Sequence, residues 1–346
     1  MRAIVIHAHG GPEVMRYEDV PTPVPAANEV LVKIHTAGVN HLDLDVRQGV
    51  AGYQIPLPHV MGSEGAGEVV AFGREVTAFR AGDRVMPASA LSSGSCRHLD
   101  CRCQRGLDNL CHNFGRLGLT CWGTFAEYIA VAPHNLVRLP DGLSFETAAA
   151  GRTTFSTAWE LAINQGGVRE GETVVVNGAG GGVGTAAIQV VKRAGARVIA
   201  TVGSRDKAGR VLALGADAVV NYREDDMAAE IRRLTHGQGA DLAIETVGGP
   251  VLKATIEAMA PGGRIAIAGA HAGEQVTIDI VKLFRRQIRI LTTSSYPKAT
   301  TATVFGELAK GHLKPVVAAA FPLAEASEAV ELLAGRTAVG KILLHG

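Results

Sequence analysis

Short apolar runs separated by glycine and proline fill the chain up to about residue 135. Runs such as AIVI, EVLVKI, GEVVAF and DRVMP are rich in β-branched residues, which favour strands, and the residues between them favour turns. After LPDGLSFETAAA the pattern changes, and apolar strands alternate with helical stretches, as in TVVVNGAG followed by VGTAAIQVVKRAG. That alternation predicts a parallel sheet covered by helices on both faces. We therefore expect an α/β protein in which an all-β domain precedes a doubly wound parallel sheet.

The length of 346 residues also favours two domains, because single cores usually stop growing below that size. The change of pattern places the first boundary near residue 139. From about residue 295 the chain mixes two helices with short strands, and periodicity alone assigns this tail to neither domain.

Charge and composition exclude several classes of function. The 34 Lys and Arg residues balance 33 Asp and Glu residues, which argues against a nucleic-acid partner. No apolar run reaches the length of a membrane span, and the start MRAIVIHAHGGPEV is typical of a strand and a turn rather than a signal peptide. We expect a cytoplasmic protein. Four of its five cysteines lie between Cys96 and Cys111, which favours a metal clip or free thiols over a disulfide scaffold.

The segment GAGGGVG, residues 178–184, is the clearest functional motif. It directly follows the apolar strand TVVVN and opens the helix GTAAIQVVKRAG. In that context the backbone N–H groups of a helix start face the pyrophosphate of a dinucleotide. The alternative is a glycine-rich turn without a ligand. The expected phosphate-binding residues are Gly180, Gly181, Gly182 and Val183.

The end of the next strand, RVIATVGS, indicates which dinucleotide binds. An NAD site usually carries an acidic residue there to hold the ribose hydroxyls. Here Gly203 and Ser204 are followed by Arg205 and Lys207, and such cations suit the 2′-phosphate of NADPH. Asp206 lies beyond the strand's end and is expected to cap a helix. The alternative is a group of solvated charges at a helix start.

The chain as a whole resembles the medium-chain dehydrogenase/reductase superfamily, and within it the quinone oxidoreductase branch. The resemblance rests on MRAIVI followed by GGPEV, on EVLVKIHTAGVNHLD, PHVMGSEGAGEV, GAGGGVG and LGADAVVNYRE, and on GKILL near the C-terminus. One departure is Gly178, where the branch usually has alanine. The resemblance implies a GroES-like β-barrel domain, residues 1–138 and 295–346, a Rossmann domain, residues 139–294, and an active site in the cleft between them.

The resemblance also implies roles for individual residues. Lys207 and Tyr222 match the positions that approach the 2′-phosphate in NADPH-using members. Thr154 matches a position beside the phosphates or the nicotinamide, and the backbone near Gly269 one beside the carboxamide. Lys341, in GKILL, is expected to reach the phosphates.

Zinc alcohol dehydrogenases of this superfamily hold a catalytic metal with a Cys, a His and a third Cys or Asp. The matching positions here are Asn40, Ser63 and Thr153. Amide and hydroxyl oxygens bind zinc poorly, so we expect no catalytic zinc. Three metal-binding side chains remain nearby, and a rearranged site is the alternative: His41, Asp43 and Glu64.

The clustered cysteines resemble the structural zinc lobe of zinc members, where the gaps between cysteines are two, two and seven residues. Here the gaps are four, one and seven. A tetrahedral site needs only four thiolates within reach, so one structural zinc is expected on Cys96, Cys101, Cys103 and Cys111. The alternative is a degenerated lobe with free thiols, since Asp100 stands where a cysteine is expected.

Without a metal to polarise an alcohol, the least demanding chemistry is hydride transfer from NADPH to an activated acceptor, a quinone or an α,β-unsaturated carbonyl compound. Asn40 is the expected donor to the developing oxyanion, and Tyr53 the candidate proton donor. The structural alternatives are that Asn40 caps a turn and that Tyr53 covers the cleft. Arg152 is unusual for the family, and either binds an anionic group or points away. The alternatives are a zinc-type alcohol dehydrogenase and a weakly catalytic NADPH-binding protein. A homodimer through IRILTTS, near residue 290, is the expected assembly.

Overall fold

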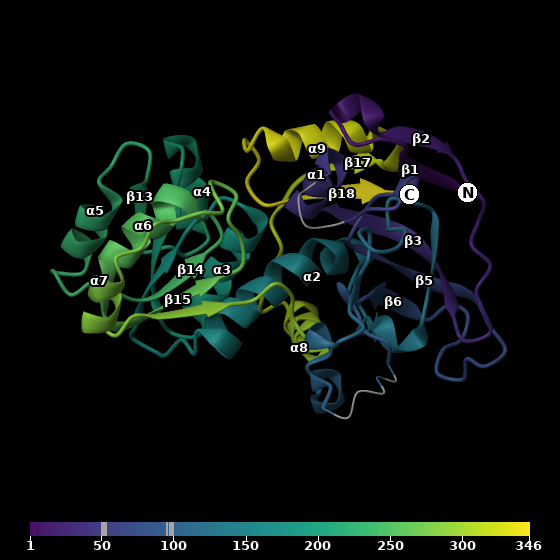
Figure 1. The fold of residues 1–346 in the computed structure, drawn as a ribbon, viewed down its shortest axis with the longest axis horizontal. Helices are drawn as coiled ribbons and strands as arrows, with labels where there is room; N and C mark the ends of the chain where they lie inside the picture. Colours follow the sequence, from purple (N-terminus) through teal and green to yellow (C-terminus); the bar gives the residue numbers. More distant parts are fainter. Residues whose placement is uncertain (50–53, 95, 97–99) are drawn as a thin grey trace. The chain divides into compact units, whose positions relative to one another are not determined.

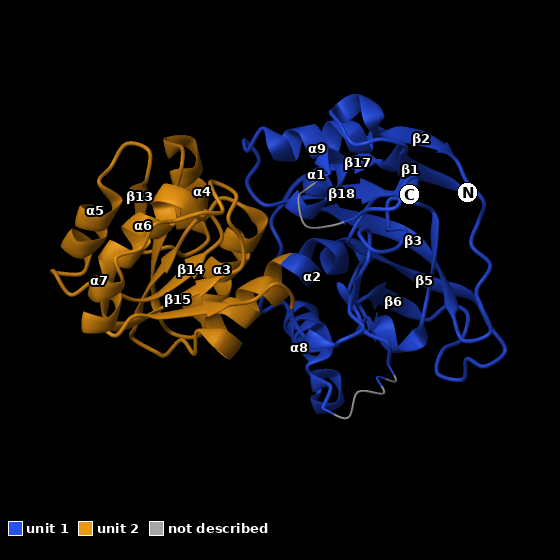
Figure 2. Ribbon diagram, viewed as in Figure 1, with its two compact units in different colours: residues 1–153, 296–346 blue, residues 154–295 orange. Residues whose placement is uncertain are grey.

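The chain forms two compact units, which Figure 2 colours separately. The computed structural model describes residues 1–49, 54–94, 96 and 100–346. Unit 1 comprises Met1–Thr153 and Tyr296–Gly346, and unit 2 comprises Thr154–Ser295. The first division falls inside α2 (Phe145–Trp159) rather than at residue 138, because the start of this helix packs on unit 1. A Cβ added to Gly38 would lie 2.9 Å from the carbonyl oxygen of Ala149.

Unit 1 is built on a seven-stranded sheet in the order β10-β6-β5-β3-β18-β17, with β9 also pairing with β3. The C-terminal strand β18 runs antiparallel to β3, with Ile342 opposite Val39, so the end of the chain completes the sheet that the beginning starts (Figure 1). A three-stranded sheet, β2-β1-β4, and a small pair, β7-β8, complete the strands. The strands are β1 (Arg2–Ile6), β2 (Arg16–Asp19), β3 (Val30–Val39), β4 (His59–Val60), β5 (Gly65–Phe72), β6 (Arg84–Pro87), β7 (Ala90–Leu91), β8 (Gly115–Arg116), β9 (Tyr128–Val131), β10 (Leu136–Arg138), β17 (Val317–Pro322) and β18 (Lys341–His345).

The helices of unit 1 pack around these strands. Helix α9 contacts β17 and β18, and its buried Ala326, Ala329 and Val330 join one core with Ile4 and Ile6. No helix among the described residues is both long and apolar enough to cross a membrane. The helical elements are η1 (Pro12–Val14), α1 (His41–Gln48), η2 (Arg102–Arg105), η3 (Asp108–Leu110), η4 (Pro133–Asn135), α8 (Lys298–Ala309), η7 (Leu323–Glu325) and α9 (Ala326–Ala334).

Unit 2 is a parallel six-stranded sheet in the order β13-β12-β11-β14-β15-β16. Successive residues Val174, Val175 and Val176 are all fully buried, so both faces of the sheet are covered, as the fully apolar strands predict. The strands are β11 (Thr173–Val176), β12 (Arg197–Val202), β13 (Ala218–Asn221), β14 (Ala240–Glu245), β15 (Met259–Ile267) and β16 (Arg289–Thr292). The helices are the π-helical η5 (Glu160–Gln165), α3 (Gly182–Arg193), η6 (Arg205–Lys207), α4 (Ala208–Ala213), α5 (Met227–Leu234), α6 (Gly249–Ala258) and α7 (Ile280–Arg285).

Candidate functional site

The glycine-rich turn of unit 2 joins β11 to α3, as the motif predicts. Gly178 has a φ of +62°, a conformation that glycine adopts at little cost. A Cβ on Gly184 would lie 2.3 Å from the carbonyl oxygen of Gly178, so only glycine lets the helix start this close to the strand. Gly181 is the N-cap of α3, and the first turn of the helix presents unpaired backbone N–H groups suited to a phosphate.

A buried polar network supports this turn, and the sequence analysis missed it. Asn177 follows β11, and its Nδ2 donates to Oε2 of Glu245, at the end of neighbouring β14, over 2.6 Å. The other oxygen of Glu245 accepts from the backbone N–H groups of Val247 (2.6 Å) and Gly248 (2.9 Å). Burial raises the pKa of Glu245. The sequence did contain a sign of this network, because Asn177 and Glu245 are polar residues at the ends of two apolar strands. The ends of adjacent parallel strands meet at one edge of the sheet.

The tip of β12 brings together the residues expected to select the cofactor. A Cβ on Gly180 would lie 2.7 Å from Cδ of Lys207, so the lysine stem lies against the phosphate turn. A Cβ on Gly203 would lie 2.7 Å from the hydroxyl oxygen of Tyr222, so this phenol lies beside the strand's end. Arg205 is exposed and forms an ion pair of 2.5 Å with Glu224.

The expectation that Asp206 caps a helix is wrong. Ser204 is the N-cap of η6, because its Oγ accepts from the backbone N–H of Asp206 over 3.3 Å. The hydroxyl of Ser204 donates in turn to the Asp206 carboxylate over 3.2 Å. Asp206 therefore faces its own turn, and no residue of the strand's end is acidic.

Two further expected cofactor residues lie in unit 2. Thr154 is buried within α2, and Gly269 follows β15, where a Cβ would lie 2.9 Å from the carbonyl oxygen of Thr246. Tyr53, the candidate proton donor, lies outside the described residues.

Unit 1 holds a cluster of charges around Glu64, which is fully buried. Its Oε2 accepts from Nζ of Lys341 over 2.5 Å, and its Oε1 accepts from the backbone N–H of Thr153 over 2.6 Å. The guanidinium Nε of Arg152 lies 3.5 Å from the same Oε1. Burial alone would raise the pKa of Glu64, but Lys341 and Arg152 hold it below its usual value. The carboxylate is therefore ionised and held by two cations.

The amide of Asn40 is part of this cluster, and its hydrogen-bonding groups are engaged. Its Nδ2 donates to Oε2 of Glu64 (3.0 Å) and to Oγ of Ser63 (3.2 Å), and its Oδ1 accepts from Lys341 over 2.6 Å. Its backbone N–H donates to Asp43 in a capping box at the start of α1. The amide expected to donate to a substrate oxygen is bound to Glu64, Ser63 and Lys341 in this structure, and its role as a donor to substrate stays a prediction.

The two cations of the cluster are both bound by neighbouring groups within unit 1. Lys341 was expected to reach the cofactor phosphates, but it is 4 % exposed and its ammonium is held by Glu64 and Asn40. Arg152 is 1 % exposed, and its Nη2 donates to the carbonyl oxygen of Ser63 over 2.6 Å. The sequence showed each charge separately, but gave no sign that they are neighbours in space.

The four clustered cysteines converge in unit 1. The sulfur atoms of Cys96, Cys101, Cys103 and Cys111 all lie within 4.8 Å of one another. Four thiolates around a tetrahedral zinc lie about 3.8 Å apart, given Zn–S bonds of about 2.3 Å. The Sγ of Cys101 lies 3.1 Å from that of Cys103 and 3.9 Å from that of Cys111, so the four residues fit this metal. The hydrogen bond from the Cys103 thiol lowers the pKa of Cys101 to about 5 and raises that of Cys103 to about 12, so without a metal these two sulfur atoms share one proton.

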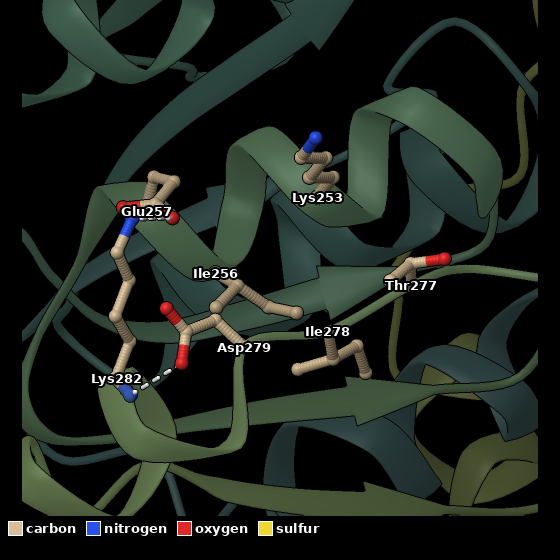
Figure 3. Close-up of a pocket in the computed structure, with 7 residues that line it drawn as sticks. All are labelled: Lys253, Ile256, Glu257, Thr277, Ile278, Asp279 and Lys282. Atoms are coloured by element: carbon tan, nitrogen blue, oxygen red, sulfur yellow. Dashed lines mark hydrogen bonds and ion pairs between the residues drawn. The ribbon is translucent and has the colours of Figure 1, made fainter.

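A pocket of about 340 Å³ lies elsewhere in unit 2, between α6 and residues 277–282 (Figure 3). Two of its charges pair with each other, since Nζ of Lys282 donates to Glu257 over 3.0 Å. Ile256 and Glu257 stand at the C-terminal end of α6, and thus at the edge of the sheet opposite the glycine-rich turn. The pocket therefore contributes nothing to the predicted site.

A strand-built unit and a doubly wound unit with a glycine-rich phosphate turn together define a class, the two-domain oxidoreductases that use a dinucleotide. Comparison with known proteins supports this. Residues 26–141 match the alcohol dehydrogenase GroES-like domain family, and residues 182–310 match the zinc-binding dehydrogenase family.

Similarity to individual proteins extends over the whole chain. It is 30 % identical to a human quinone oxidoreductase over 99 % of this chain and 97 % of that protein. It is 31 % identical to an acryloyl-coenzyme A reductase of Metallosphaera sedula over 99 % of both. Among solved structures, an NAD-dependent alcohol dehydrogenase is 46 % identical with a TM-score of 0.94, covering 100 % of both chains. The Escherichia coli quinone oxidoreductase complexed with NADPH is 26 % identical with a TM-score of 0.85, also over 100 % of both.

The chain belongs to the medium-chain dehydrogenase/reductase superfamily, as a quinone oxidoreductase-like member. The predicted fold class, a GroES-like domain with a Rossmann parallel sheet, is confirmed. The names of the relatives support an oxidoreductase.

Proposed function

We propose that this protein is an NADPH-dependent reductase that transfers hydride to quinones or α,β-unsaturated carbonyl compounds without a catalytic metal. The observation that carries the proposal is the commitment of the Glu64 carboxylate to Lys341 and Arg152. A carboxylate that is already held by two cations is a poor ligand for zinc. The neighbouring positions, Asn40 and Ser63, offer only an amide and a hydroxyl, which also bind zinc poorly. Activated acceptors need no metal, because they accept hydride without prior deprotonation of an alcohol.

In the enone reaction the hydride adds to the β-carbon and negative charge develops on the carbonyl oxygen. A proton then adds to the α-carbon. A cluster with two cations and one ionised carboxylate favours negative charge nearby. We propose that Asn40 orients this cluster and that Tyr53 remains a candidate acid. The relative named acryloyl-coenzyme A reductase supports this substrate class, since an acryloyl thioester is an α,β-unsaturated carbonyl compound.

We propose NADPH as the cofactor, bound by the glycine-rich turn and by Lys207, Tyr222, Ser204 and Arg205. Support comes from the cationic tip of β12 and from the relative solved with NADPH. Thr154 and the backbone near Gly269 are proposed to bind the rest of the dinucleotide. Lys341 is left out, because its ammonium is held within unit 1.

The change Lys207→Ala tests the cofactor assignment. It removes a cation beside the phosphate turn, and a hydrogen bond to a charged group is worth about 1.5–3 kcal/mol. We therefore expect the dissociation constant for NADPH to rise roughly tenfold to a hundredfold, and that for NADH to change little, as measured by fluorescence titration. Lys253→Ala, in the remote pocket, is the matched control. If wild-type protein binds NADH as tightly as NADPH, the assignment is wrong.

The reaction itself is tested by NADPH oxidation with a simple quinone and a simple enone. Turnover with either supports the reductase, and binding of NADPH without turnover supports the weakly catalytic alternative. The NAD-dependent alcohol dehydrogenase at 46 % identity favours a second candidate, alcohol oxidation with NAD at a rearranged metal site. Zinc-dependent oxidation of alcohols in place of enone reduction would establish that function instead.

We also propose one structural zinc on the four clustered cysteines. Metal analysis of protein purified without added zinc should find about one zinc per chain, the stoichiometry of a four-cysteine site. Cys103→Ser should lose it, whereas Cys121→Ser, at an exposed cysteine outside the cluster, should retain it. Wild-type protein without zinc, or a zinc that Cys121→Ser removes, would contradict the proposal.

The assembly and the location are part of the same proposal. Strand β16 is the edge of the sheet of unit 2, and it is mostly exposed. Ile290 on this strand and Ile280 and Phe284 on the preceding helix α7 are exposed apolar side chains. We propose a homodimer through this edge. The composition is that expected of a cytoplasmic enzyme, and this location stays a prediction.

A further inference from the structure

A line of hydroxyl groups leads away from the buried guanidinium of Arg152. Its Nη1 donates to the phenol oxygen of Tyr296 over 3.4 Å, and this phenol donates to Oγ1 of Thr153 over 3.5 Å. Arg152 and Tyr296 are 1 % and 5 % exposed, whereas Thr153 is only half-buried. The line therefore runs within unit 1 from a buried fixed charge to a half-buried threonine.

The direction of these hydrogen bonds is fixed by chemistry. A guanidinium only donates, so the oxygen of Tyr296 must accept from Arg152 and its proton points to Thr153. Among the described residues, the structure records no acceptor for the hydroxyl proton of Thr153. The line is thus oriented to release a proton at its outer end. Both distances are long for hydrogen bonds, as is common before a substrate tightens a catalytic site.

The surroundings suit a phenol that gives up its proton briefly. Burial raises the pKa of Tyr296, so the phenol is protonated at neutral pH. The charge of Glu64 also raises this pKa, whereas the charge of Arg152 lowers it. Arg116 also lowers it. A phenolate formed here would lie beside a guanidinium, in a low-dielectric interior where that attraction is strong.

We propose that Thr153 and Tyr296 deliver the proton that completes the reduction of an enone, with Arg152 as the residue that positions Tyr296. This inference rests on the proposed function and identifies the source of the proton that the reduction of an enone requires. Hydride from NADPH forms the C–H bond at the β-carbon, and the π electrons of the C=C bond move to form an enolate. The α-carbon takes the proton of Thr153, which takes that of Tyr296. The phenolate left beside Arg152 regains a proton from water.

Quinones do not need this relay. Their reduction places charge on oxygen, and a hydroquinone oxygen exchanges protons with water directly, whereas an α-carbon needs a positioned acid. Loss of the relay should therefore slow enone reduction and leave quinone reduction unchanged. This contrast separates a proton donor from a residue that merely holds the fold.

The test compares Tyr296→Phe with wild type on one quinone and one enone. We expect kcat for the enone to fall about a hundredfold, within the range typical of a lost general acid. We expect kcat for the quinone, the dissociation constant for NADPH and the melting temperature to stay close to wild type. The matched control is Tyr128→Phe, on β9 of unit 1, which should change neither reaction.

Labelling gives an independent readout. In D₂O the wild-type product should carry deuterium on one face of the α-carbon, and the Tyr296→Phe product on both faces, because water would then supply the proton. Equal loss of enone and quinone turnover would overturn the proposal. An enone-selective loss in Tyr53→Phe but not in Tyr296→Phe would overturn it too, and would assign the proton to Tyr53.

Arg152 is tested by Arg152→Lys and Arg152→Met. The lysine variant should retain more enone turnover than the methionine variant. Loss of a cation from the Glu64 cluster should lower turnover of both acceptors, and the ratio of enone to quinone turnover should fall most in the methionine variant. Arg47→Met is the control for loss of a buried arginine, since Arg47 is 4 % exposed and pairs with Glu331 over 2.6 Å. It should lower stability without selectivity between acceptors.

If wild type reduces neither acceptor, the proposed function has failed. If wild type reduces both and no variant is selective, only the relay has failed.

Discussion

At the scale of the residue, burial decides the charge of Asp43. It lies at the third position of α1 and is 1 % exposed, and its Oδ2 accepts from the backbone N–H of Asn40 over 2.7 Å. Its pKa is raised from 3.8 to about 7, and burial is the main cause. The hydrogen bond from Asn40 and the charge of Lys341 lower this pKa, but by less than burial raises it. A carboxyl group at the edge of the Glu64 cluster is therefore half-protonated near neutral pH.

This shift predicts a pH dependence of stability. Between pH 3.8 and about 7 the folded protein holds a proton on Asp43 that the unfolded chain has lost. The free energy of unfolding should therefore fall as pH rises through that window. Asp43→Asn should remove this component, which urea unfolding at pH 5 and pH 8 would show. Asp19→Asn, at an exposed carboxylate, is the control. An unchanged pH dependence in Asp43→Asn would contradict the assigned shift.

At the scale of the element, the contact between β11 and α3 depends on one missing side chain. A Cβ on Gly184 would meet the carbonyl oxygen of Gly178 at 2.3 Å and Cα of Ala179 at 2.6 Å, and neither backbone atom can move without opening the turn. The motif was predicted from the sequence because strand, turn and helix follow one another directly. Local order of this kind needs no knowledge of distant residues.

Gly184→Ala tests that contact. Overpacking costs about 1–3 kcal/mol, and the displaced turn should also weaken NADPH binding, as measured by denaturant unfolding and titration. The control is Gly209→Ala in α4, where a Cβ would meet nothing within 4 Å. Since alanine favours helix, the control should gain up to about 1 kcal/mol. Equal effects of the two changes would show that the close approach is unimportant.

At the scale of the whole molecule, the sheet of unit 2 ends at an unpaired edge. Strand β16 pairs with β15 on one side only, and Ile290 on it is 38 % exposed. Exposed edges with apolar neighbours associate readily unless they are covered. Helix α7 precedes this strand in the chain and also carries an exposed apolar residue, Phe284 at 62 % exposure.

Ile290→Lys tests the proposed homodimer. A buried, unpaired ammonium at the edge would oppose association, so we expect the variant to be monomeric where wild type is dimeric, measured by light scattering after size exclusion. Val24→Lys, at an 87 % exposed valine in unit 1, should leave the assembly unchanged. A variant that remains dimeric would place the interface elsewhere.

The sequence by itself determined the α/β class, the parallel sheet and the glycine-rich turn, because periodicity and motifs are local properties of the chain. Only the tertiary structure decided that Glu64, Arg152 and Lys341 are neighbours, since they come from three distant segments and no local pattern links them. It likewise decided that β18 completes the sheet begun by β3. A buried charge is tolerated only beside its partners, and partners far along the chain meet only when the chain has folded.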